Sequence, residues 1–206
     1  MGVSVAFFDV DTQADFMLPT GSLYVPGAER IIPNLEKLVR FAVERGIPLL
    51  SSADAHPLDD PSFREWPPHC VVGTPGQRRI PATDLPDAVI VPNRPGAFSQ
   101  PETWPRQMVI EKQEYDATTN VNFDAILRGL APRRFVVFGV ATDYCVQSTA
   151  RSLLQRGFQV DLVTDAIRAI TPEGGQRAIE EVVAAGGRLI TTRSLLPNGR
   201  GERRVS

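Results

Sequence analysis

The sequence predicts an α/β fold with a mostly parallel sheet, because strand-like and helix-like segments alternate along the chain. The strand-like segments are continuous apolar runs, which are typical of strands buried on both faces. The helix-like segments carry apolar residues three or four positions apart. A length of 206 residues is sufficient for one core and short for two, so we expect residues 1–206 to form a single domain.

The first part of the chain predicts two strands, one helix and a long loop. Residues 3–10 are an unbroken apolar run and predict the first strand. An apolar stripe over residues 31–43, closed by Gly46, predicts a helix. Residues 47–51 predict a second buried strand. Proline, glycine and aspartate are frequent over residues 54–81, and this composition predicts a long irregular loop.

The middle of the chain continues the alternation. The short apolar runs 88–91 and 107–112 predict strands, and the spacing of apolar residues over 123–130 predicts a helix. A strand beginning at Phe135 follows. It leads through a tight turn into a helix over residues 146–154, so the chain passes from strand to helix within a few residues.

The last part of the chain repeats this order. Residues 158–163 predict a strand. Thr171 and Pro172 are a typical N-cap and first-turn pair and open the last predicted helix. Residues 188–191 predict the final strand. The segment 198–206 is polar, and we expect it to be a loose tail.

Composition excludes several classes of partner. The net charge is −2 and there is no basic tract, so we expect no nucleic-acid partner. The apolar run at the start is too short to cross a membrane and lacks a basic leader and a cleavage site, so we expect neither a membrane anchor nor secretion. The two cysteines, Cys70 and Cys145, lie far apart, which favours free thiols and a cytoplasmic location. The sequence leaves open whether the chain forms a homo-oligomer.

Polar residues stand at the ends of several predicted strands. Asp11 follows the first strand and Asp54 the second, Lys112 ends the 107–112 strand, and Cys145 follows the strand that begins at Phe135. Ligands of parallel α/β sheets bind outside the carboxyl ends of the strands. We therefore expect an acid, a lysine and a cysteine to meet at one sheet edge.

Asp11, Lys112 and Cys145 together predict a nucleophilic site. A carboxylate can accept the thiol proton, and an ammonium stabilises the thiolate. Cys145 would then attack a carbonyl carbon, and the backbone N–H groups of residues 140–145 could bind the oxyanion. Each residue also has a structural interpretation: a loop carboxylate, a solvated lysine and a packing cysteine.

Asp54, His56 and His69 form a second set, in the proline-rich segment. One carboxylate with two imidazoles suits a divalent metal with positions left for water or substrate. Ser62, Glu65 or water alone could complete the coordination. The structural alternative is that both histidines are ordinary surface residues of a loop.

Two aromatic residues, Phe16 and Trp66, flank these polar candidates. They could form a slot for a flat ring, although packing in the core or at its rim is an equally good interpretation. Cys70, next to His69, is interpreted as a packing residue.

These segments resemble the nicotinamidase branch of the isochorismatase-like cysteine hydrolases. The matching segments are Asp11 to Phe16, Asp54 to His56, Trp66 to Cys70 with Gly73 to Gly76, Lys112, and Gly139 to Cys145. The resemblance implies a three-layer α/β/α, Rossmann-like fold with about six strands. It selects Asp11 over Asp9, which precedes it by two and would share its face of a strand.

The resemblance also implies roles for individual residues. Cys145 would form a thioester while nicotinamide is hydrolysed to nicotinate and ammonia, a reaction of NAD salvage. Asp11 would be the base, and Lys112 would hold the charges around it. The amides of Ala141 and Cys145 would form the oxyanion hole, and the Val140–Ala141 bond would be cis.

The resemblance assigns the second set to a metal ion. Asp54, His56 and His69 would bind zinc, or alternatively iron or manganese, and the ion would accept the pyridine nitrogen. The residues expected to line the substrate pocket are Phe16, Trp66, Ala141 and Tyr144.

Three other functions remain open at this point. The first is a cysteine hydrolase of the same fold that acts on another small amide or carbamoyl compound. The second is a non-catalytic binding module, which would have no use for an intact Asp11, Lys112 and Cys145 set. The third is a metallohydrolase in which a metal-bound water attacks and Cys145 is inert.

Overall fold

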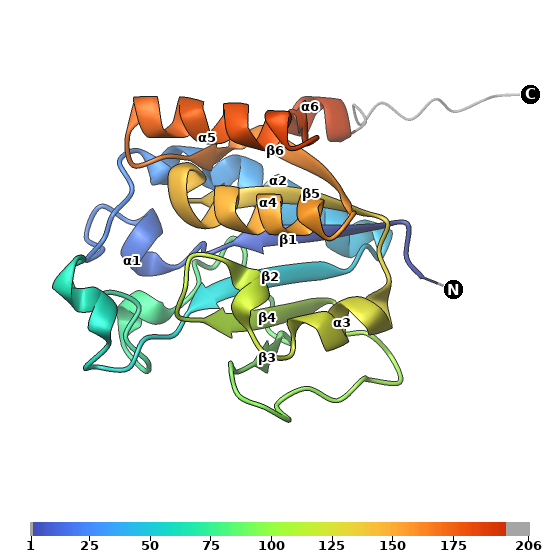
Figure 1. Cartoon of the computed structure of the whole chain (residues 1–206), viewed down its shortest axis with the longest axis horizontal. Coiled ribbons are helices and arrows are strands. Elements are labelled where there is room, and N and C mark those ends of the chain that lie inside the picture. Colours follow the sequence, from blue (N-terminus) through green and yellow to red (C-terminus); the bar gives the residue numbers. More distant parts are fainter. Residues whose placement is uncertain (1, 197–206) are drawn as a thin grey trace, which may run out of the picture.

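A seven-stranded parallel sheet forms the centre of the computed structural model, which describes residues 2–196 (Figure 1). The strand order is β3-β4-β2-β1-β5-β6-β7, and every neighbouring pair is parallel. The strands are β1 (Val5–Val10), β2 (Leu49–Asp54), β3 (Val89–Val91), β4 (Gln107–Lys112), β5 (Arg134–Val140), β6 (Gln159–Arg168) and β7 (Arg188–Ile190). The predicted tail over 198–206 lies outside the described residues.

Helices cover both faces of this sheet and give the expected α/β/α layers (Figure 1). The helices are α1 (Ala14–Met17), α2 (Ile32–Arg45), α3 (Phe123–Leu130), α4 (Gln147–Gln155), α5 (Pro172–Ala184) and α6 (Thr192–Leu195). Apolar residues of α3, α4 and α5 pack on one face, and those of α2 and α6 pack on the other. Neighbouring residues of β1 point to opposite faces of the sheet and so pack on different helices. Phe8 packs near Phe123 of α3, and Phe7 stacks on Phe41 of α2, as the alternation of a strand requires.

The predicted fold class and all seven strand segments are confirmed, with three differences. The sheet has seven strands and not about six, because the three-residue β3 pairs with β4 at the edge. Strand β6 continues to Arg168, beyond the predicted end at Val163, because the polar Thr164 and Asp165 remain within the strand. The one-turn helices α1 and α6 were not predicted, because four residues are too few to show a helical periodicity in the sequence.

The long loop is largely irregular, as predicted. After β2 it contains two short 3-10 turns, Pro61–Arg64 and Pro75–Gln77. Its far end returns to the start of the chain, where Gln13 and Arg79 form an antiparallel bridge. The loop therefore lies against the carboxyl end of β1.

Strand β1 lies in the middle of the sheet, with β2 on one side and β5 on the other. The chain thus builds the sheet outward in both directions from β1, and the crevice at such a switch point is where α/β folds bind ligands. Within residues 2–196, no helix combines the length and apolar character needed to cross a membrane.

Candidate active site and metal centre

Cys145 lies in the turn that joins β5 to α4. The Val140–Ala141 peptide bond is cis, as the resemblance implies, and residues Thr142–Val146 form one turn of π-helix before α4 begins. Cys145 is buried but borders a pocket. Gly139 allows β5 to approach β1 closely here, because a Cβ atom at this position would lie 2.1 Å from the carbonyl oxygen of Val10.

Lys112 connects the candidate base to the thiol. It is the last residue of β4 and its side chain is fully buried. The Lys112 Nζ lies 2.8 Å from Asp11 Oδ2 and 3.7 Å from Cys145 Sγ. Asp11 Oδ1 accepts a hydrogen bond of 2.6 Å from the Ser52 hydroxyl. The structure therefore brings together the three residues that the sequence predicted would meet.

Asp11 and Asp9 have different partners, although the sequence placed them on one face of a strand. Strand β1 ends at Val10, and Asp11 has a left-handed backbone with φ of 48°, which aspartate tolerates better than most residues. The regular alternation therefore does not extend to Asp11. Asp9 forms an ion pair with Arg79, whereas Lys112 pairs with Asp11 and Asp54.

Burial governs the protonation of this group. Burial raises the pKa of the Cys145 thiol well above its usual range, and the nearby Lys112 opposes this only in part. Burial also raises the pKa of Asp11, against the lowering effect of Lys112. For Lys112 burial favours the neutral amine, but Asp11 and Asp54 outweigh it and raise its pKa. The resting site thus combines a protonated thiol, a strengthened base and a fixed ammonium.

Three donor atoms converge beside this group. Asp54 Oδ2 lies 3.6 Å from His56 Nε2 and 3.8 Å from His69 Nε2, and single donor atoms of the three residues lie within 4.8 Å of one another. All three side chains are buried. This donor set, two imidazole nitrogens and one carboxylate oxygen, fits a divalent transition metal with open positions.

The other nitrogen of each histidine ring is held by the protein. His56 Nδ1 contacts Asp60 Oδ2 at 2.9 Å, and His69 Nδ1 contacts the carbonyl oxygen of Pro67 at 2.8 Å. Such contacts fix the ring so that Nε2 faces the metal position. Ser62, a predicted candidate for the fourth ligand, donates from its hydroxyl to Asp60 Oδ1 at 2.6 Å, so it supports Asp60 in this structure. Glu65 lines a second, more polar cavity beside these donors, together with Ser62, Trp66 and Tyr115.

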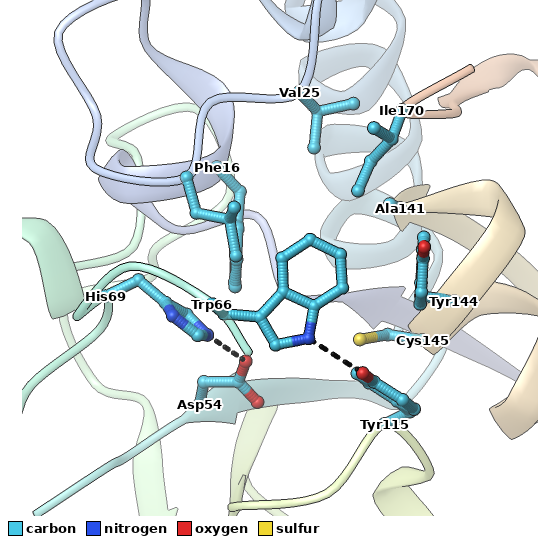
Figure 2. A pocket seen from close by; sticks show the side chains of 11 residues that line it. Phe16, Val25, Asp54, Trp66, His69, Tyr115, Ala141, Tyr144, Cys145 and Ile170 are labelled. Atoms are coloured by element: carbon cyan, nitrogen blue, oxygen red, sulfur yellow. Dashed lines mark hydrogen bonds and ion pairs between the residues drawn. The ribbon is translucent and has the colours of Figure 1, made fainter. Parts of the chain in front are cut away.

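An apolar pocket lies above the nucleophile (Figure 2). It contains about 410 Å³ of empty space, which includes space open to solvent. All four predicted pocket residues line it, together with Cys145 and two of the candidate metal donors. The lining residues are Phe16, Leu23, Val25, Asp54, Trp66, His69, Tyr115, Ala141, Tyr144, Cys145 and Ile170. A flat substrate in this pocket would therefore border both the thiol and the metal position.

Several residues of the site were not predicted to act there. The side chain of Gln13 brackets Asp54, because it donates to the Asp54 carbonyl at 2.8 Å and accepts from its N–H at 2.7 Å. Asp15 accepts from the backbone N–H of Cys70 at 2.7 Å. Both belong to the matching segment that begins at Asp11, which was their only signal. Asp60 and Tyr115 had no distinguishing pattern in the sequence.

Comparisons with known proteins find similar sequences and similar folds. The family model described as the isochorismatase domain matches residues 5–194. The chain is similar to the nicotinamidase of Escherichia coli (strain K12), with 32% identity over 88% of this chain and 92% of the relative. It is similar to the nicotinamidase of Acinetobacter baylyi, with 29% identity over 93% and 94%. Among solved structures, a pyrazinamidase of Pyrococcus horikoshii in complex with zinc superposes with a TM-score of 0.77 and 35% identity, covering 91% of this chain and 99% of that one.

Proposed function

Since this chain belongs to the isochorismatase family, we propose that it hydrolyses nicotinamide to nicotinate and ammonia through a thioester on Cys145. One observation carries the proposal: a single apolar pocket borders the Cys145 thiol and the candidate metal donors Asp54 and His69. A ring that reaches the metal position would have its carboxamide beside the sulfur. The similarity to two nicotinamidases supports the choice of substrate.

The acylation step assigns one role to each buried group. Cys145 Sγ attacks the carboxamide carbon while Asp11 accepts the thiol proton, and a C–S bond forms as the carbonyl becomes an oxyanion. The backbone N–H groups of Ala141 and Cys145 donate to that oxyanion. Asp11 passes its proton to the nitrogen, the C–N bond breaks, and ammonia leaves. The raised pKa of Asp11 makes it a better base for this exchange.

The deacylation step uses the same residues. A water molecule attacks the thioester carbon while Asp11 accepts its proton, the C–S bond breaks, and Cys145 regains the proton as nicotinate is released. Lys112 stays protonated throughout both steps. Its Nζ contacts Asp11 and lies 3.7 Å from Cys145 Sγ, so its charge stabilises whichever of these two groups is anionic.

We propose that Asp54, His56 and His69 hold a zinc ion. A divalent ion held there would supply a Lewis acid for the pyridine nitrogen and so would orient the ring. The zinc complex of the similar pyrazinamidase supports the choice of metal, and the buried donors with fixed histidine rings support the site. Phe16, Trp66, Ala141 and Tyr144 would enclose the ring. Two free thiols suit a reducing cytoplasm.

The test is ammonia release from nicotinamide and a panel of other small amides, with and without a chelator. We expect nicotinamide to be the best substrate and pyrazinamide to be accepted. Chelation should abolish turnover of both, and zinc should restore it. Turnover of nicotinamide that persists after complete metal removal would contradict the metal role. If a carbamoyl compound were hydrolysed faster than nicotinamide, and its hydrolysis were unaffected by the chelator, the assignment of nicotinamide as the substrate would be wrong.

A further inference from the structure

A second buried acid lies on β1, and the proposed mechanism does not use it. Asp9 is fully buried two residues before Asp11. Its Oδ2 contacts the guanidinium of Arg79 and accepts a hydrogen bond of 3.0 Å from the Thr12 hydroxyl. Burial raises the pKa of Asp9, which Arg79 opposes. Arg79 is thus the counter-charge that the Asp9 carboxylate requires.

Arg79 joins three segments of the chain. Its Nη1 donates to the carbonyl oxygen of Ser52 in β2 at 3.1 Å. Its Nη2 contacts Asp9 and also donates to Thr12 Oγ1 at 3.0 Å and to the carbonyl oxygen of Thr83 at 3.2 Å. One planar guanidinium therefore binds β1, β2 and the segment just after the proline-rich loop from two separate nitrogens.

The partners of Arg79 are one step from the candidate catalytic and metal residues. Ser52, whose carbonyl Arg79 holds, gives its hydroxyl to Asp11 Oδ1 at 2.6 Å. Gln13, which pairs with Arg79 across the antiparallel bridge, brackets the backbone of Asp54 with its side chain. A displacement of Arg79 would therefore also displace the residues that hold Asp11 and Asp54.

The pair is poorly suited to stabilising the fold alone. Both side chains are buried, and within the described residues Asp9 Oδ1 and Arg79 Nε have no hydrogen-bond partner. A buried ion pair with unsatisfied atoms contributes little net stability, and apolar residues of similar size often replace such a pair without loss. Its contacts to Ser52 and Thr83 have a geometric effect that apolar residues would not reproduce.

We propose that Arg79 is a positioning residue, with Asp9 as its counter-charge, which orients the catalytic carboxylate of Asp11 through Ser52. The role of Asp11 in this inference rests on the proposed function. The guanidinium fork fixes the end of β2 against β1, so that the Ser52 hydroxyl meets Asp11 Oδ1 and Asp11 Oδ2 meets Lys112.

Two variants separate positioning from charge compensation. The double variant Asp9→Leu with Arg79→Met replaces the pair by apolar side chains and leaves no unpaired charge. Arg79→Lys keeps the charge for Asp9, but its single nitrogen cannot contact Ser52 and Thr83 as the fork does. The control is Asp161→Leu with Arg188→Met, a more exposed bidentate pair between β6 and β7.

Each protein is measured in three ways: thermal unfolding, kcat and KM for nicotinamide, and the rate of Cys145 alkylation by iodoacetamide in the metal-free protein. We expect both Arg79 variants to fold, to lose about tenfold to a hundredfold in kcat with KM unchanged, and to alkylate about tenfold more slowly. The control pair should leave kcat and alkylation unchanged.

Wild-type kcat and wild-type alkylation in either folded Arg79 variant would overturn the proposal. If the double variant does not fold, Arg79→Lys alone decides. The alkylation assay needs neither nicotinamide nor metal. If the wild-type protein did not hydrolyse nicotinamide, the proposed function would fail while the alkylation rates would still show whether Arg79 orients the site.

Discussion

Asp54 and Lys112 are register partners where β2 and β4 pair, and their side chains form a buried ion pair. The two oxygens of Asp54 have different neighbours. Oδ1 contacts Lys112, and Oδ2 lies 3.6 Å from His56 Nε2 and 3.8 Å from His69 Nε2. One carboxylate therefore contacts the lysine of the proposed acid-base group and also belongs to the proposed metal site.

Removal of the Asp54 charge should affect both the proposed metal site and the acid-base group around Lys112, whereas removal of a histidine should affect the metal site alone. Asp54→Asn is expected to abolish metal retention and also to slow Cys145 alkylation in metal-free protein, because Lys112 loses one of two carboxylates that sustain its charge. His56→Ala should lose metal and bind substrate weakly but alkylate as the wild type does. Metal analysis and alkylation kinetics check this, and equal alkylation in the two variants would contradict it.

Replacement of the thiol should stop turnover and spare the metal site. Cys145→Ala is expected to lower kcat by at least about 10⁴-fold, because Cys145 is the only thiol among the described residues that line the pocket. Cys145 is not one of the three donor residues, so bound metal should be unchanged. Ammonia release and metal analysis measure both. A variant with nearly normal turnover would point to attack by a metal-bound water.

The acid limb of the pH profile should report on Asp11. The proposed base acts when ionised, so kcat/KM falls as pH drops through its pKa, and burial places that pKa above the usual value of about 3.9. Lys112→Met removes the charge that lowers this pKa, so the limb should move to higher pH in the residual activity. The exposed Lys37→Met is the control. Metal content is measured at each pH, and a limb that does not move would contradict the assignment of Asp11.

Asp60 should support the metal without contacting it. Asp60→Asn weakens the contact that fixes His56 Nδ1, and we expect metal affinity to fall about tenfold to a hundredfold. Its neighbour Asp59 is exposed, which makes Asp59→Asn a matched control that should bind metal normally. Competition with a chromophoric chelator gives both affinities. Equal affinities would show that His56 is oriented without Asp60.

Trp66 and Tyr115 form a wall between two cavities. The indole Nε1 of Trp66 donates to the Tyr115 hydroxyl at 2.9 Å (Figure 2). Both residues line the apolar pocket and the second, more polar cavity. Tyr115→Phe should raise KM about two- to tenfold, the equivalent of one hydrogen bond, with kcat retained. The same change in a Trp66→Phe background should have no further effect on KM. Additive effects on KM would show that Tyr115 acts independently of Trp66.

Local patterns were sufficient to predict the fold and to bring most site residues to one edge. Apolar runs marked the strands, and a parallel sheet collects the residues that follow them, so Asp11, Lys112 and Cys145 could be grouped before any contact was known. The pairing of Asp54 with Lys112 could not be predicted in this way, because strand order and register depend on contacts between distant segments.

The residues that support the site, Asp60, Arg79 and Asp9, could not be predicted either, because their roles also depend on contacts made only in the folded chain. Asp60 looked like an ordinary turn residue among prolines, and its contact with His56 depends on how the loop folds back. Arg79 carries no motif, and its role follows from contacts with residues 70 and 27 positions away. Asp9 could be noticed but not interpreted, because its partner is not a neighbour in sequence.

The origin of the pocket residues has a consequence for engineering. The proposed metal donors and Trp66 come from residues 54–69, on the β2 side of β1, whereas Ala141, Tyr144 and Cys145 come from the turn after β5 on the other side. We therefore expect that residues 55–78, a range that leaves Arg79 in place, can be exchanged between relatives to change which amide is accepted, while Asp11, Lys112 and Cys145 stay unchanged.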